Sequence, residues 1–175
     1  MKKIIALICA ALVSVSALAG CGNTDSDAPM GFKEISEEGV TYDLYVPDEW
    51  VTDISTGVTA AYYSGIDPTN ISMMAFELDG SVSSIADYWT SYEPSLKAMF
   101  PDLAYVYEPE EFTLDGVTAV QYVYTGTFTD TPYKIMQVVA FKDATVYIFT
   151  YTAEADKYDT HFEDVLAILA NFKFH

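Results

Sequence analysis

The chain of 175 residues contains no arginine, and its eight lysines stand against 26 carboxylates, which gives a formal net charge of -18. Proteins that follow nucleic-acid phosphates need clusters of lysine and arginine, so this composition excludes nucleic acid as a partner. Hydrophobic residues make up 51% of the chain and aromatic residues 15%, unlike a disordered acidic tail. The length suits one domain with a short appendage.

Cysteine is also scarce, and both cysteines lie near the N-terminus. Lys2 and Lys3 precede an apolar stretch over residues 4–13, which is shorter than a membrane-spanning helix, and small residues follow it. This order is typical of an export signal. The tetrapeptide Leu18-Ala19-Gly20-Cys21 then resembles the bacterial lipobox. In that class of signal the cysteine thiol receives a diacylglyceryl group, and cleavage between Gly20 and Cys21 makes the lipidated cysteine the new N-terminus.

We therefore expect a signal peptide over residues 1–20 and a lipidated, flexible polar tether over residues 21–31. The alternative is an ordinary secretory signal in which Cys21 is incidental. Because Cys9 would leave with the signal, the mature body would have no thiol for a disulfide, a nucleophile or a cysteine-based zinc site. Loss of the signal would leave six lysines against 26 carboxylates, a net charge of -20. An anionic membrane would repel such a body, so the acyl chains would hold it at the extracytoplasmic face of the cell membrane.

The rest of the chain, from residue 32 to the end, alternates in the manner of strands. Strands are expected over residues 40–46, 58–63, 71–78, 105–108, 111–114, 117–128, 133–142 and 146–153. Asp115-Gly116 and residues 143–145 are typical hairpin turns. Residues 135–141 are apolar on both faces of their strand, which predicts cover on both sides of the sheet.

Two segments have helical spacing instead. Over residues 83–100, apolar residues recur at intervals of three and four, with Ser83 or Ser84 as N-cap. Pro94 predicts a kink or two short helices there. Residues 158–172 place an apolar stripe along a final helix that would cover part of the sheet. The sequence predicts a single α+β domain over residues 32–175, with an antiparallel sheet of about six to eight strands sandwiched by helices.

Three stretches, in this order, resemble the PsbP-like family (Mog/PsbP fold). They are residues 42–50, residues 67–72 with the sequence Asp-Pro-Thr-Asn-Ile-Ser, and residues 147–153 followed by the final helix. Together they span about residues 38–173. The resemblance implies an antiparallel sheet between helices and a non-enzymatic role, because characterised members assist or bind other proteins. The metal-binding histidines of some plant members have no counterpart here, so it implies no metal and no cofactor for this chain.

Residues that could carry chemistry are few. His161, in the final helix, and His175 are interpreted as solvated or locally paired rather than as catalytic bases, and no nucleophile elbow, phosphate loop or His-Glu-x-x-His motif is present. The carboxylates around residues 108–111 and 156–164 are interpreted as a solvated acidic surface. The many strand tyrosines are interpreted as packing residues. The alternative is an exposed platform of tyrosines with Trp50 or Trp89 that binds a protein or a sugar.

These observations predict a lipid-anchored, non-enzymatic binding or assembly accessory with a protein partner. Cys21 is the one residue with a specific chemical role. Two alternatives stay open. A module for a glycan or small apolar ligand would have an open concavity lined by tyrosine. A carboxylate-dependent cell-wall hydrolase would have a cleft with two convergent carboxylates.

Overall fold

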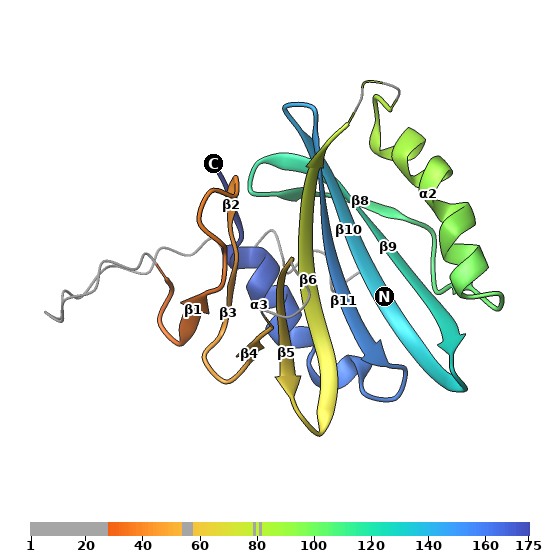
Figure 1. Ribbon diagram of the computed structural model, residues 1–175, viewed down its shortest axis with the longest axis horizontal. Helices are drawn as coiled ribbons and strands as arrows, with labels where there is room; N and C mark the ends of the chain where they lie inside the picture. Colours follow the sequence, from red (N-terminus) through yellow and green to blue (C-terminus); the bar gives the residue numbers. More distant parts are fainter. Residues whose placement is uncertain (1–27, 54–57, 79, 81) are drawn as a thin grey trace, which may run out of the picture.

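The fold is built on one large antiparallel sheet, seen in a computed structural model that describes residues 28–53, 58–78, 80 and 82–175. Gly20, Cys21 and the expected signal lie outside the described residues. Eight strands form the sheet in the order β4-β5-β6-β11-β10-β9-β7, with β8 also paired to β9 (Figure 1). Their bounds are β4 Val51–Thr52, β5 Thr59–Ser64, β6 Asp67–Glu77, β7 Ala104–Tyr105, β8 Glu110–Leu114, β9 Val117–Phe128, β10 Thr131–Lys142 and β11 Thr145–Glu154. The expected α+β class and number of strands are confirmed.

Tight hairpins connect the strands from β8 to β11. Their turns consist of Asp115-Gly116, Thr129-Asp130 and Asp143-Ala144, and both residues of each turn have positive φ, from 42° to 81°. Two-residue turns of this handedness match the twist of the flanking strands. The hairpins expected around Asp115-Gly116 and around residues 143–145 are therefore confirmed.

Both faces of the sheet are covered, as the apolar residues on both sides of β10 predict. Met136, Val138 and Ala140 point into a core that they share with α3 (Phe162–Asn171), which follows a short 3₁₀ turn, η1 (Tyr158–Thr160). Ile135 and Val139 point into a second core on the other face, beneath α2 (Ile85–Met99). Among the described residues, no helix is long and apolar enough to cross a membrane.

The single strand expected over residues 40–46 is divided into two short strands. This segment forms β2 (Tyr42–Asp43) and β3 (Tyr45–Pro47), which lie outside the large sheet. Strand β2 pairs with β12 (Lys173–Phe174) and β3 pairs with β1 (Phe32–Glu34). Between them, Leu44 is fully buried, and its backbone bonds to the side chain of Ser36 and the amide of Ile35. Leu44, Tyr45 and Val46 are all buried, and β3 contacts α3, so the apolar residues of this segment pack on the helix although they lie outside the large sheet.

Helix α2 is a single helix that runs through Pro94, so the expectation of two short helices is wrong. Ser84 is the N-cap, and its hydroxyl accepts a hydrogen bond from the amide of Asp87. Aromatic side chains near both ends of the helix pack on the sheet, and this packing offsets the hydrogen bond that Pro94 cannot donate. The strand expected over residues 105–108 is reduced to β7, which begins one residue earlier.

Candidate functional site

A cavity of about 600 Å³ lies between α2 and the sheet. Its floor comes from strands β6, β9, β10 and β11, and its side wall comes from α2 through residues that include Tyr88, Tyr92 and Ser95. Three large apolar side chains at this cavity are solvent-exposed: Met74 (44%), Phe76 (37%) and Met99 (58%). We call this cavity the α2 groove. Its volume is within the range of small-molecule sites, and its open, partly tyrosine-lined form is the one expected of a ligand-binding module.

The groove exists because α2 is held over one side of the sheet. Trp89 stacks on Tyr122 of β9, with ring centroids 3.5 Å apart and planes 8° apart. Its indole nitrogen donates a hydrogen bond of 2.8 Å to the hydroxyl of Tyr105 in β7. At the other end of the helix, Phe100 lies so close to β9 that a Cβ added at Gly126 would be 2.7 Å from it. Figure 1 shows α2 beside β9, and on the same face of the sheet Met74 and Phe76 of β6 stay exposed.

The polar groups of the groove are all neutral. Gln137 is 5% exposed; its carbonyl accepts a hydrogen bond of 3.0 Å from the Tyr124 hydroxyl, and its amide donates one of 3.2 Å to the Thr150 hydroxyl. Burial raises the pKa of Tyr88 to about 12, and it also raises the pKa of Tyr124, so both phenols stay protonated at neutral pH. Among the described residues that line the groove, none is a carboxylate, a lysine or a histidine. In a chain with 26 carboxylates, this is a distinct chemical environment.

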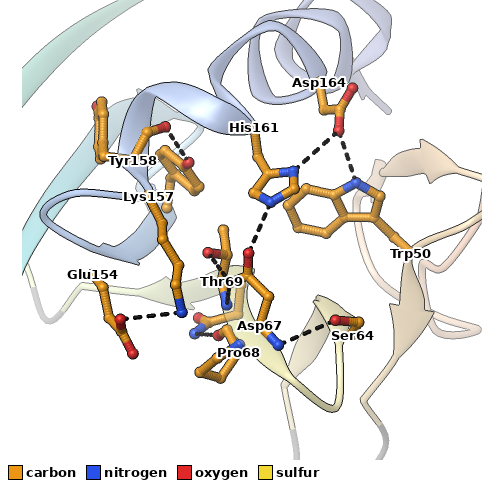
Figure 2. Close-up of polar contacts among 12 residues, drawn as sticks. Trp50, Ser64, Asp67, Pro68, Thr69, Glu154, Lys157, Tyr158, His161 and Asp164 are labelled. Atoms are coloured by element: carbon orange, nitrogen blue, oxygen red, sulfur yellow. Dashed lines mark hydrogen bonds and ion pairs between the residues drawn. The ribbon is translucent and has the colours of Figure 1, made fainter.

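A second arrangement of polar side chains surrounds His161 on the opposite face of the sheet (Figure 2). The imidazole is 6% exposed and lies between two carboxylates: Nε2 is 3.1 Å from Asp67 Oδ2, and Nδ1 is 3.8 Å from Asp164 Oδ2. Asp164 Oδ2 also accepts a hydrogen bond of 3.2 Å from the indole of Trp50. The Tyr63 ring packs on the imidazole at 3.9 Å between centroids. The cluster therefore connects the start of β6, the segment after β3 and the start of α3.

The contacts of the imidazole join separate elements of the fold. Both polar partners that the described residues offer His161 are carboxylates. The interpretation of His161 as locally paired is confirmed, although it is buried and precedes α3 instead of lying within it. His175 is also paired, at 2.7 Å from Asp43.

The cluster predicts a specific response to acid. Burial alone would raise the pKa of Asp67, but hydrogen bonds from Thr69 and His161 outweigh it and lower the pKa below its usual value of 3.8. A carboxylate with a lowered folded-state pKa stabilises the fold above its unfolded pKa, and this contribution is lost as the pH falls through the folded-state value. We expect Asp67→Asn to be less stable than the wild type at pH 7, and we expect this difference to shrink by pH 3.

Urea unfolding at the two pH values measures the effect. Glu108→Gln is the matched control, because Glu108 is an exposed carboxylate outside the cluster around His161, and it should change stability by no more than about 0.5 kcal/mol at either pH. A stability difference for Asp67→Asn that is the same at pH 7 and pH 3 would contradict the assignment.

The aromatic and acidic residues that the sequence singled out have clear positions. Trp50 and Trp89 are 0% and 7% exposed, so an exposed platform containing either tryptophan is wrong. The packing interpretation is confirmed for four strand tyrosines that are buried in the two cores: Tyr122, Tyr124, Tyr147 and Tyr151. Glu108 and Glu111 are exposed, as expected of a solvated acidic surface. Within the described ranges, no group of histidines and carboxylates could hold a metal ion.

Comparisons with known proteins establish the fold. The sequence matches no protein-family model, and a search of curated proteins finds no relative. The chain is similar to the solved structure of PsbP (CyanoP) from Synechocystis sp. PCC 6803, with a TM-score of 0.63 and 15% identity over 90% of this chain and 99% of that one. It is also similar to LpqN of Mycobacterium tuberculosis, a protein involved in cell envelope biogenesis, with a TM-score of 0.60 and 18% identity over 81% of this chain and 89% of that one. The PsbP-like fold that the sequence motifs implied is therefore confirmed.

Proposed function

We propose that this protein is a non-catalytic binding protein, held by a lipid on Cys21 at the extracytoplasmic face of a bacterial membrane, and that its ligand binds in the α2 groove. The observation that carries the proposal is the groove itself: about 600 Å³ of mainly apolar space beside three exposed apolar side chains. A monomeric soluble protein rarely exposes such side chains together unless they contact something else. The likeness of the fold to LpqN, which is involved in cell envelope biogenesis, supports an envelope role.

The composition of the groove supports binding over catalysis. General acid–base chemistry needs a titratable group beside the substrate. The described lining residues offer only tyrosines in this role, and burial raises the pKa of two of them, Tyr88 and Tyr124. A carboxylate-dependent hydrolase needs two convergent carboxylates in the cleft that holds the sugar. No carboxylate is among the described residues that line the α2 groove. The hydrolase alternative is therefore less well supported than the ligand-binding module.

The anchor is tested by Cys21→Ser. We expect the variant to lack lipid, to stay uncut between residues 20 and 21, and to lose its stable attachment through acyl chains, because two acyl chains are needed for firm retention. Mass spectrometry of the mature N-terminus and fractionation of membranes measure these effects. Cys9→Ser is the matched control and should be processed normally. Normal lipidation at another residue of the Cys21→Ser variant would overturn the anchor.

Binding in the groove is tested with a single introduced thiol. Once Cys21 carries lipid, Ser95→Cys would supply the one free thiol of the mature chain, on the wall of the groove. Ala86→Cys is the matched control, because nine residues at 100° each place it on the opposite side of α2, where it is exposed. The lipid-anchored variants are reconstituted in phosphatidylcholine vesicles, and the rate of reaction with a water-soluble maleimide is measured.

We expect a lipid and metabolite extract of the producing cells to slow the reaction of Ser95→Cys about tenfold at a ligand concentration of about ten times the Kd. The reaction of Ala86→Cys should stay unchanged. Equal rates for Ser95→Cys with and without the extract would argue against a ligand-binding groove.

A further inference from the structure

We propose that the α2 groove takes an uncharged single-chain amphiphile: a hydrocarbon chain that ends in a hydroxyl- or ester-bearing group, the class to which monoacylglycerols belong. This inference rests on the proposed ligand-binding function of the groove and adds the chemical class of the ligand. Three features carry it: the change of polarity along β11, the lack of charged groups in the described lining, and the exposed, unbranched methionine side chains that border the groove.

The floor changes from apolar to polar along β11. The register places Met74 of β6 opposite Ile148, and two residues further along β11 it places Thr150 opposite Gln137 of β10. Thr152 follows on the same face, opposite Ile135 of β10, so the polar part of the floor is formed by Gln137, Thr150 and Thr152 beside one apolar neighbour. The apolar end is bordered by Phe76 and Tyr88, whose ring centroids are 6.3 Å apart. A ligand that fits this floor is itself graded, with a chain at one end and hydrogen-bonding groups at the other.

The polar end can bind a neutral group. Gln137 has two amide N–H groups, and within the described part of the chain its side chain donates to the hydroxyl of Thr150. Its carbonyl is engaged by Tyr124. The second N–H and the hydroxyl of Thr152 therefore suit a ligand carbonyl or hydroxyl. A buried polar group that is hydrogen-bonded in this way adds specificity at small cost.

The charge of the protein selects against ionised ligands. None of the described residues that line the groove offers a counter-ion, and the desolvation of an unpaired charge is costly. An anionic headgroup would also be repelled by the negative electrostatic potential of the protein, which has a formal net charge of -18. A free fatty acid or an anionic phospholipid is therefore a poor fit, and a phospholipid with two long chains fills more volume than about 600 Å³.

The side chains that border the groove suit a flexible chain. Met74 and Met99 are exposed and unbranched, and methionine adapts to ligands of irregular shape. Opposite them, the strands that form the floor are rigidly paired. A hydrocarbon chain can therefore be covered by methionine side chains without any change in the sheet.

The test uses 1-decanoylglycerol and decanoate, two probes with the same chain that differ in charge at pH 7, and the Ser95→Cys protein in phosphatidylcholine vesicles. We expect 1-decanoylglycerol to slow the maleimide reaction of Ser95→Cys in a saturable manner, decanoate to have at least tenfold lower apparent affinity, and Ala86→Cys to be insensitive to both. In the same background, Thr152→Val, which keeps the shape of the side chain, should weaken protection by 1-decanoylglycerol about two- to tenfold, because one hydrogen bond is lost. It should leave the unfolding midpoint unchanged.

Each other outcome has a distinct meaning. Equal protection by decanoate and 1-decanoylglycerol would overturn the preference for uncharged ligands. Protection by the cell extract but by neither probe would overturn the amphiphile while the binding function stands, and protection by an oligosaccharide alone would assign the groove to a glycan. Protection that rises with protein density, without any added ligand, would mean that a second copy of the chain covers the groove. Failure of the extract as well as both probes would overturn the proposed function together with this inference.

Discussion

Replacement of Trp50 by alanine is expected to lower the free energy of unfolding by about 3–5 kcal/mol, the range for a large aromatic side chain deleted from a core. Trp50 is completely buried, and its ring contacts Tyr63 and His161 edge-on, with centroids 6.1 Å from each. Its indole N–H donates to Asp164 at 3.2 Å. Alanine would leave both a cavity and a carboxylate without its donor.

Urea unfolding followed by circular dichroism measures this effect, since it does not depend on tryptophan fluorescence. Trp50→Phe separates the two contributions, because it keeps most of the ring and removes the N–H; we expect a smaller loss than for alanine. Val51→Ala is the surface control, because Val51 is 40% exposed, and it should change stability by no more than about 0.5 kcal/mol. A loss below about 1 kcal/mol for Trp50→Ala would show that the cluster around His161 does not stabilise the fold as described.

Gly126→Ala is expected to destabilise the protein by about 1–3 kcal/mol, although alanine is normally the better strand residue. The added Cβ would lie 2.7 Å from both Cβ and Cγ of Phe100. These atoms are close to the backbone of the residue that ends α2, so the contact can be relieved only if the end of the helix moves away from β9. The same shift would change the α2 groove, and the maleimide reaction of Ser95→Cys would report it.

A double-mutant cycle with Phe100→Ala tests the cause. In the Phe100→Ala background the cost of Gly126→Ala should become smaller without vanishing, because Cγ and the ring are gone while the Cβ of residue 100, also 2.7 Å from the added Cβ, remains. Gly65→Ala is the matched glycine control, since a Cβ there would meet nothing within 4 Å. Equal costs of Gly126→Ala in both backgrounds would mean that Phe100 is not the reason for the glycine.

The central part of the sheet is predictable from the sequence because its contacts are local. Strands β9, β10 and β11 follow one another through two-residue turns, so alternation and turn residues define both the strands and their order. The division of residues 40–46 into β2 and β3 is not predictable in this way. Its partners, Phe32–Glu34 and Lys173–Phe174, lie on either side of it in the sequence, and the second pair is more than 100 residues away.

The α2 groove was missed because its apolar residues have the sequence pattern of core residues. Met74 and Phe76 continue an apolar strand, and Tyr88 and Met99 continue an apolar helical stripe. The space between them arises from the stacking of Trp89 on Tyr122 and of Phe100 over Gly126, which are tertiary contacts. The exposed open form of the groove therefore has no local signal in the sequence.

The three stretches that resemble the PsbP-like family meet at one place. Trp50 ends the first stretch, Asp67 begins the second, and His161 and Asp164 lie in the third, where they form the cluster of Figure 2. Asp67 and His161 are 94 residues apart in the sequence, so their pairing could not be predicted from spacing. Two residues of the resembling stretches, Trp50 and Asp67, therefore help to join the sheet to the final helix.

The position of β1 also determines how far α2 would lie from the point of membrane attachment. In Figure 1, β1 and α2 lie at opposite ends of the longest axis, and the chain enters the fold through β1. If Cys21 holds the lipid, the domain is attached to the membrane near β1, and α2 is at the opposite end of the domain. A ligand bound beneath α2 would then lie at the end of the domain that is farthest from the lipid anchor. It could be presented to proteins that stand above the bilayer surface.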